Sequence, residues 1–246
     1  EDSDPPATRA LRTTPPTKTN ATGWTLGRVP GSTMARLGAV LAQTPMEGRA
    51  WKAHSKEGMQ GNELPMMQLQ LQRRLSKLHQ EWWLAAEETL LSLHLVCPRC
   101  EGNLTTCHCP LPPPANSTPG ATEGNLATHR IRDVDLNRVG PGAAVWPHLD
   151  AEVHGGDPTL LVLLQPATRG GLLLVAKERD VSWRESEAGG LTLARRARDT
   201  EYVGLRECGD VCCLDGCAFV HEVRQVHGCV PRLTMSVTVS CSPVSL

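Results

Sequence analysis

The sequence predicts a mainly β fold, a sandwich or jelly roll, for residues 126–246, with a helical segment packed against it. From Ala127 onward, short apolar runs recur between clusters of Gly, Pro, Asp and Arg, and no strong helical stripe intervenes. Earlier, between residues 64 and 95, apolar side chains recur instead at steps of three and four residues. The predicted strands are the runs 143–146, 159–164, 171–175, 211–214, 219–223 and 233–239.

The first half of the chain divides into three parts by composition. Residues 1–60 are rich in Pro, Thr, Gly and charge without a sustained period, which predicts a flexible or loosely attached region. Residues 61–96 are predicted to form a helical support segment, as one long helix or two shorter ones. Residues 97–125 are a Cys/Pro-rich linker or insertion. The helical stripe consists of Leu71, Leu75, Leu78, Trp82, Ala85 and Thr89.

Composition narrows the classes of function. The chain has 246 residues, a formal net charge of −1 and a sequence pI near 6.8. A protein that grips a phosphate backbone usually carries a basic excess, so there is no strong indication of nucleic-acid binding. We also expect no membrane span, because no apolar run approaches the roughly 20 residues that one needs. The sequence begins at Glu1, not Met, which predicts that an upstream segment has been removed.

Four closely spaced cysteines precede the β half of the chain. Cys97 and Cys100 form one pair, and Cys107 and Cys109 flank His108 in a second. Two such pairs supply enough ligands for a zinc ion, but the usual second CxxC is missing. A disulfide-stapled loop explains the same spacing, and both interpretations stay open.

Glycosylation motifs and the cysteine count bear on localisation. Three Asn-X-Ser/Thr tripeptides begin at Asn20, Asn103 and Asn116, all in expected loops. The ten cysteines are an even number, as in disulfide-bonded proteins. These features favour the secretory pathway (the ER lumen or secretion), and reduced cytosolic thiols remain an alternative.

A metal site is predicted from two apolar runs in the β half. The run Trp146-Pro147-His148-Leu149-Asp150 places His148 and Asp150 two residues apart, so on a strand both side chains point to one face. A second imidazole is available from His221 in a later apolar run. Two imidazoles and one carboxylate on one face of an octahedral ion leave three positions open, as in non-haem Fe(II) oxygenases.

The order of motifs around these residues resembles the prolyl-4-hydroxylase-like branch of the 2-oxoglutarate/Fe(II)-dependent dioxygenases. The resemblance covers about residues 131–239. Its pieces are Arg138-Val139-Gly140-Pro141-Gly142 before His148, the run 159–164 with Gly170-Gly171, Cys208-Gly209-Asp210 with Leu214-Asp215-Gly216 before His221, and Arg232-Leu233-Thr234-Met235-Ser236.

The resemblance implies a double-stranded β-helix domain at 126–246 with an iron centre. His148, Asp150 and His221 would hold Fe(II) as the catalytic centre. Arg232 would bind the far carboxylate of 2-oxoglutarate through a bidentate fork, and Thr234, two residues on, could donate to the same group. The implied cofactors are Fe(II), the co-substrate 2-oxoglutarate and O₂, with ascorbate a further candidate. The implied reaction is hydroxylation of a C–H bond, with a protein or peptide side chain such as proline as substrate.

Some residues depart from the pattern of this family. Val139 stands where relatives often carry a Tyr that contacts 2-oxoglutarate, and the gap from His221 to Arg232 is one residue longer than usual. Two alternative functions therefore stay open. The same iron site could oxidise a small metabolite or a methylated base, or the jelly roll could be a catalytically silent binding domain.

Two further predictions concern residues near the site. Cys212, Cys213 and Cys217 are expected to be small core residues or to form a disulfide with Cys208 or Cys229. His227 is expected to be exposed on the turn before Gly228.

Overall fold

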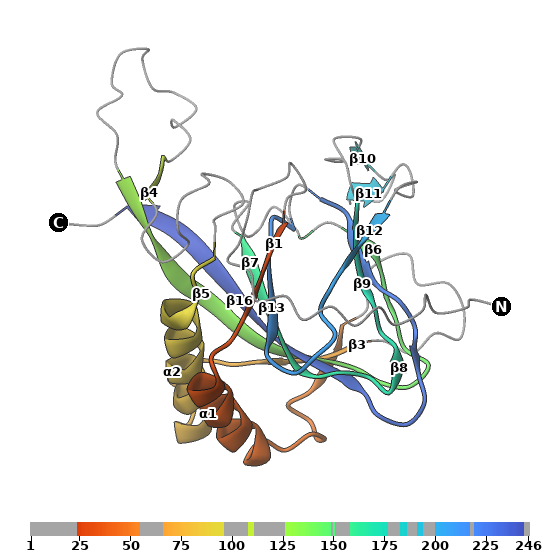
Figure 1. Ribbon diagram of the computed structural model, residues 1–246, viewed down its shortest axis with the longest axis horizontal. Coiled ribbons are helices and arrows are strands. Elements are labelled where there is room, and N and C mark those ends of the chain that lie inside the picture. The colour runs from red at the N-terminus through yellow and green to blue at the C-terminus, as the bar shows by residue number, and fades with distance from the viewer. Residues whose placement is uncertain are drawn as a thin grey trace, which may run out of the picture.

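The computed structural model describes residues 24–54, 66–95, 108–110, 126–148, 150, 158–176, 183–185, 191–193, 200–216 and 219–243. Two antiparallel sheets dominate it (Figure 1). The larger sheet has the strand order β1-β13-β7-β16-β5-β3-β2, with β4 paired to β5, and the smaller has the order β12-β9-β14-β6. The mainly β prediction is confirmed.

The elements have the following bounds. The helices are α1 (Gly31–Ala42) and α2 (Lys77–Ser92). The strands of the larger sheet are β1 (Trp24–Arg28), β2 (Lys52–His54), β3 (Met66–Gln70), β4 (His108–Pro110), β5 (Leu126–Val139), β7 (Thr159–Gln165), β13 (Asp210–Leu214) and β16 (Arg232–Pro243). Those of the smaller sheet are β6 (Val145–His148), β9 (Leu173–Ala176), β12 (Thr200–Val203) and β14 (His221–Val223). Two short pairs complete the set: β8 (Arg169–Gly170) with β15 (Val226–His227), and β10 (Trp183–Glu185) with β11 (Leu191–Leu193).

The connections are those of a jelly roll. Following the chain, β5, β7, β13 and β16 lie in the larger sheet, while β6, β9, β12 and β14 between them lie in the smaller. The two sheets face each other across shared apolar side chains, including Leu163, Leu214 and Val175. At one end of this space, Val139, Ala143 and Val226 form a small buried group, which we call the end cluster. The space between the sheets is where the predicted site residues lie.

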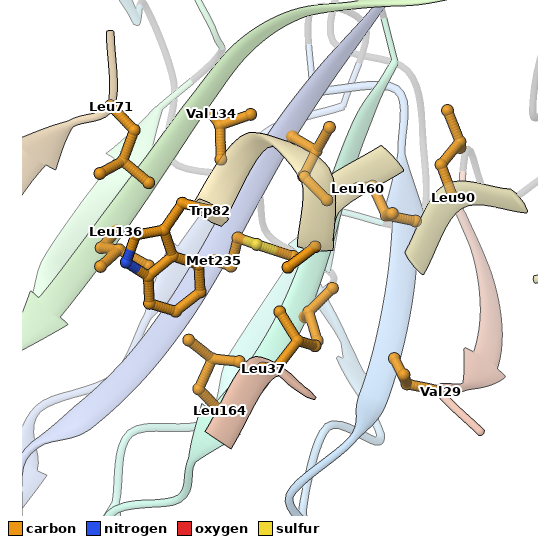
Figure 2. Close-up of a cluster of buried hydrophobic side chains, with 14 of the residues drawn as sticks. Val29, Leu37, Leu71, Trp82, Leu90, Val134, Leu136, Leu160, Leu164 and Met235 are labelled. Carbon is orange, nitrogen blue, oxygen red and sulfur yellow. The ribbon is translucent and has the colours of Figure 1, made fainter. Parts of the chain in front are cut away.

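Both helices cover the outer face of the larger sheet (Figure 1). Trp82 and Leu37 are fully buried and pack over Met235 of β16 (Figure 2). Trp82 also keeps its one polar atom satisfied, because its Nε1 donates to Thr44 Oγ1 at 2.9 Å. Burying a large side chain in this way is worth about 1.5 to 3 kcal/mol. The helical layer therefore stabilises the sheet that carries Arg232.

The predicted support segment is only partly helical. Residues 66–70 form β3, which pairs with β5, and the helix begins only at Lys77. The helix starts there because Ser76 is its N-cap and accepts a hydrogen bond from His79 N at 3.3 Å. Leu75, assigned to the stripe from its spacing, lies before the helix and is 64% exposed. The segment therefore holds one helix, Lys77–Ser92, preceded by a strand, where one long helix or two shorter ones were expected from residue 64.

The N-terminal region differs from the prediction of a loose segment over residues 24–54. Strand β1 pairs with β13 in the larger sheet, and α1 buries Leu37 and Val40. The segment lacks a long apolar period, so its order comes from tertiary packing that composition does not reveal. The division of the chain into four parts stays a prediction, since residues 1–23, 55–65 and 111–125 lie outside the described structure.

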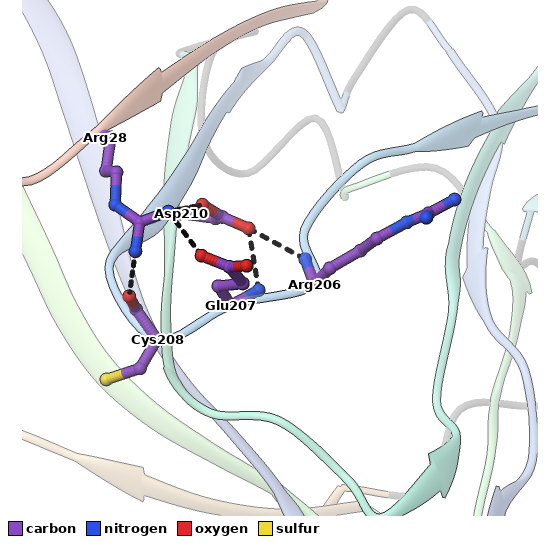
Figure 3. Close-up of polar contacts among 5 residues, drawn as sticks. All are labelled: Arg28, Arg206, Glu207, Cys208 and Asp210. Atoms are coloured by element: carbon purple, nitrogen blue, oxygen red, sulfur yellow. Dashed lines mark hydrogen bonds and ion pairs between the residues drawn. The ribbon is translucent and has the colours of Figure 1, made fainter. Parts of the chain in front are cut away.

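A polar cluster ties β1 to the turn before β13 (Figure 3). Arg28 Nη1 lies 2.8 Å from Glu207 Oε2 and 3.2 Å from Asp210 Oδ1. Asp210 Oδ2 accepts from the backbone N–H groups of Arg206 and Glu207 at 2.8 and 2.7 Å. The exposed ion pairs contribute little alone, but the two backbone bonds fix the turn that leads towards the site.

Several predictions fall wholly or partly outside the described residues. Cys97, Cys100 and Cys107 are not described, and Cys109 is described only as a backbone position in β4, so the zinc prediction stays open. The three glycosylation motifs also lie outside. Cys208, Cys212, Cys213 and Cys229 are in no disulfide, and Cys212 and Cys213 are fully buried, as small core residues are. Cys217 lies outside the described residues. No helix within the described ranges is long and apolar enough to cross a membrane.

Candidate metal centre

Two strands of the smaller sheet bring the predicted histidines together. Strand β6 ends at His148 and β14 begins at His221, and these two residues lie opposite each other in the antiparallel register. Their ring centroids are 4.2 Å apart at an interplanar angle of 53°. A register irregularity follows between His221 and Val223, so the pairing is local to this end of the strands.

Asp150 completes the group from the segment after β6. Its Oδ1 lies 3.7 Å from His148 Nε2 and 3.6 Å from His221 Nε2. Its backbone N–H donates to Gly216 O at 2.9 Å, which anchors the carboxylate against the segment that leads to His221. One ligand atom from each of the three residues lies within 4.8 Å of the others. The structure thus places together the three residues predicted from sequence.

The orientation of His221 is set by the backbone. Its Nδ1 lies 3.1 Å from the carbonyl oxygen of Phe219, and a proton on Nδ1 would donate to that oxygen. This bond leaves Nε2 as the lone-pair nitrogen that faces Asp150. Metal-binding histidines are commonly fixed through their second nitrogen in this way. His221 is buried, whereas His148 and Asp150 are 14% and 24% exposed at the side chain, so the group is open on one side.

Gly216 is a site residue that the sequence motif contained but did not explain. A Cβ atom at this position would lie 2.0 Å from Asp150 Oδ2 and 3.1 Å from His221 Cε1. Any side chain here would displace the carboxylate. Glycine is therefore required at this position because a side chain would clash, and not because of the backbone conformation. This requirement becomes visible only in the folded structure.

The donor set suits a divalent transition metal. Metal–ligand bonds near 2.1 Å place neighbouring ligands of an octahedral ion about 3 Å apart. The two Nε2–Oδ1 separations of 3.7 and 3.6 Å would need to contract by less than an ångström. Two imidazoles and one carboxylate on one face are the ligand set of non-haem Fe(II) sites. The residues present therefore fit such an ion.

Arg232 and Thr234 lie on the facing sheet and point into the same space. On β16, Leu233 and Met235 pack under the helices, so the alternate residues Arg232 and Thr234 face the interior. They are 4% and 5% exposed. A buried cation on an inner wall is suited to a carboxylate ligand, to which it can offer two parallel hydrogen bonds.

The glycine pair before β9 packs against the stem of Arg232. Gly170 and Gly171 both have positive φ, at 72° and 67°. A Cβ at Gly171 would lie 3.2 Å from Arg232 Cδ, and one at Gly170 would lie 2.2 Å from Gln225 O. The hairpin therefore needs glycine both for its conformation and for its close approach.

Cys212 lies on the inner wall beside Arg232. Burial raises the pKa of the Cys212 thiol, and the positive charge of Arg232 opposes that rise. The thiol stays protonated at neutral pH, so it acts as a small packing residue in this wall. His227, by contrast, is exposed in β15, as predicted.

Solved structures share this fold. An oxidoreductase of the 2OG-Fe(II) oxygenase family from Burkholderia pseudomallei is 15% identical, with a TM-score of 0.50, covering 90% of this chain and 86% of its own. The non-heme α-ketoglutarate-dependent epimerase SnoN from nogalamycin biosynthesis is 14% identical, with a TM-score of 0.54 and coverages of 89% and 78%. A Trichoplax adhaerens prolyl hydroxylase in complex with a hypoxia inducible factor peptide fragment is 11% identical, with a TM-score of 0.52 and coverages of 89% and 84%.

These similarities establish the fold, which is the jelly roll of 2-oxoglutarate oxygenases. No family model matches the sequence. The comparison with curated proteins also finds no match. The evidence for its chemistry therefore comes from its own residues.

Proposed function

We propose that this protein is an Fe(II)- and 2-oxoglutarate-dependent dioxygenase that hydroxylates a C–H bond. The observation that carries the proposal is the pairing of two features across the space between the sheets. One wall brings His148, Asp150 and His221 within 4.8 Å, and the facing wall buries Arg232. A metal ion and an anionic co-substrate would be held between them.

Each residue has a role in this proposal. His148, Asp150 and His221 would bind Fe(II) through Nε2, a carboxylate oxygen and Nε2, and leave one face of the ion open. Arg232 would hold the far carboxylate of 2-oxoglutarate, with the Thr234 hydroxyl as a second donor. When bound, the iron and 2-oxoglutarate supply the oxygen chemistry, in which 2-oxoglutarate is decarboxylated to succinate and one oxygen atom enters the C–H bond.

The apolar side chains of both sheets would keep bulk water away from the reacting groups. Leu163, Leu214 and Phe219 belong to the buried cluster between the sheets, and Phe219 also orients His221 through its carbonyl oxygen. Exclusion of water strengthens the electrostatic contacts inside such a site and limits side reactions.

We further propose a peptidyl side chain, such as proline, as the substrate. The motifs before His148 and around Arg232 resemble those of the prolyl hydroxylase branch, and a prolyl hydroxylase of this fold binds a peptide fragment. The epimerase of the same fold belongs to nogalamycin biosynthesis, so the fold does not decide the substrate.

Anaerobic titration of the full chain with Fe(II) and 2-oxoglutarate tests the iron site. We expect the weak visible charge-transfer band of the chelate in the wild type, no band in His148→Ala, and loss of 2-oxoglutarate binding in Arg232→Ala. His227→Ala is the matched control, because this histidine is exposed outside the site, and its band should be unchanged. A folded wild-type protein without the band would overturn the proposed function.

A second experiment tests the substrate. Proline-containing peptides should increase succinate formation from 2-oxoglutarate and should gain the mass of one oxygen atom, and Asp150→Ala should abolish both. If the band forms but no peptide is oxidised, the iron site stands and the peptide substrate is wrong.

A further inference from the structure

The inner wall of the larger sheet carries a row of polar side chains that the proposed iron chemistry does not use. On β5, Val134 and Leu136 pack under the helices, so Asp135 and Asn137 point into the space between the sheets. On β16, Ser236 lies opposite Asp135 in the register. Asp135 therefore shares an inner wall with Arg232 and Thr234.

Two acceptor atoms in this row lack a donor among the described residues. Asn137 Nδ2 donates to Ser236 Oγ at 2.9 Å, and the Gln68 side chain donates a hydrogen bond to the Asp135 carboxyl group. Asp135 Oδ1 and Asn137 Oδ1 are buried, and no described residue donates to either. Buried acceptors are normally satisfied, so this pair of oxygens indicates a place where a donor-bearing ligand can bind.

By residue count, the row and the metal centre lie at similar distances from the end cluster. Measured along β5, Asp135 lies four residues from the end cluster, and His148 and His221 each lie five residues from it along their own segments. If every residue contributed the strand rise of about 3.3 Å, all three would lie roughly 13 to 17 Å from that end. A group held by Asp135 would thus lie between the sheets, about as far from the end cluster as the metal centre.

The electrostatics of the row favour a cation. Burial and, next, the neighbouring Asp133 carboxylate raise the pKa of Asp135 to about 6. At neutral pH the carboxyl group is therefore ionised at a cost that a bound cation would relieve. Asp133 is 30% exposed at its side chain, and its Oδ2 lies 3.6 Å from Arg132 Nε, so a neighbouring cation partly balances its charge.

We propose that Asp135, with Asn137 beside it, is a specificity-determining residue that binds an ammonium or guanidinium group of the substrate. The two free acceptor oxygens and the carboxylate charge match the donors and charge of such a group. The inference rests on the proposed function in calling the ligand a substrate, and it assigns that substrate a cationic group near the C–H bond that is oxidised.

Binding of a simple amine tests the site without iron. The full chain, without added metal, is titrated with n-butylammonium and, separately, with neutral 1-butanol, and binding is followed by saturation-transfer NMR of the ligand. We expect saturable binding of the ammonium only. Asp135→Asn should weaken it by about tenfold or more, because a charge-assisted hydrogen bond is lost.

A matched variant separates this site from general attraction to acidic groups. Glu81→Gln removes a carboxylate from α2, which lies on the outer face of the larger sheet, and should leave the affinity for n-butylammonium unchanged. Absence of saturable ammonium binding, or equal binding to wild type and Asp135→Asn, would overturn the inference. If the protein binds ammonium but forms no iron chelate, the Asp135 site is supported and only the proposed dioxygenase function is overturned.

Discussion

The two faces of strands β5 and β16 differ sharply in chemistry although both are largely buried. The outer face presents Leu136 and Met235 to the helices, and both are fully buried among apolar side chains. The inner face of the same strands presents Asp135, Arg232 and Thr234 to the space between the sheets. Apolar burial stabilises the fold, whereas buried charge costs free energy unless it is paired. The difference fits the proposal that the inner face binds a ligand while the outer face supports the fold.

The largest effect on stability should come from the outer face. Leu136→Ala leaves a cavity under α2 and should lower the free energy of unfolding by about 2 to 5 kcal/mol. Leu84→Ala, at a 49% exposed position of α2, should change it by no more than about 0.5 kcal/mol. Chemical denaturation of both variants provides the measurement. A loss below about 1 kcal/mol in Leu136→Ala would contradict the supporting role of this face.

The inner space should be intolerant of added volume at the metal centre. In Gly216→Ala the new methyl group would meet Asp150 Oδ2 at 2.0 Å, so the carboxylate must move. We expect the affinity for Fe(II) to fall by about 10- to 100-fold, the range seen when groups that support metal ligands are altered.

A second glycine gives the control. A Cβ at Gly204 would lie 3.8 Å from Leu26 Cδ1, an ordinary contact, so Gly204→Ala should keep its iron affinity. Anaerobic Fe(II) titration compares the two variants. Equal affinity in Gly216→Ala and wild type would mean that Asp150 does not hold the metal in this geometry.

The ionised Asp135 carboxyl group on the inner face should lower the free energy of unfolding by an amount that depends on pH. The pKa of Asp135 is raised from 3.8 to about 6, so the folded state holds this proton more tightly than the unfolded state. The stabilisation from protonation is complete below about pH 4 and is lost as the pH rises through about 6. The rise in pKa corresponds to a loss of stability of roughly 3 kcal/mol at high pH. Because the carboxyl group is only partly buried, solvent screening reduces this loss to about 1 to 2 kcal/mol.

The variant Asp135→Asn removes the titration and isolates this cost. At pH 7.5 it should unfold with a free energy about 1 to 2 kcal/mol higher than the wild type, and the gap should close near pH 3.5. The other titratable group that acts on Asp135 is Asp133, which both proteins retain. A less stable Asn variant at pH 7.5 would indicate a structural carboxylate and not one kept for binding.

The apolar runs and the proximity of His148, Asp150 and His221 were the features that sequence predicted best. Each of the six predicted runs overlaps an observed strand, because a strand buried on both faces reads as a short apolar segment. His148 and Asp150 were recognisable since residues two apart share a strand face. Their approach to His221 depends on antiparallel pairing of β6 with β14, which only the order of motifs suggested.

Other features depended on contacts that sequence does not display. Strand β5 alternates charged and apolar residues, and none of the predicted apolar runs falls on it. Strand β3 contains Met66 and Leu69 at a helical step, and its pairing with β5 overrides that spacing. Gly216 resembles any turn glycine until Asp150 is seen against it. In each case the deciding partner is distant in the chain.

The smallest effect should come from the charged rim of the helical layer. Arg36 Nη1 lies 2.6 Å from Glu88 Oε2 and links α1 to α2, with side chains 43% and 36% exposed. Solvent screens such pairs, so a double-mutant cycle of Arg36→Gln and Glu88→Gln should give a coupling of about 0.2 to 1 kcal/mol. Glu88 also accepts a hydrogen bond from the Thr33 hydroxyl at 3.2 Å. The double-mutant cycle removes the contribution of this bond, because the bond does not involve Arg36. A coupling above about 2 kcal/mol would mean that charge, and not the apolar face beneath it, holds the helices on the sheet.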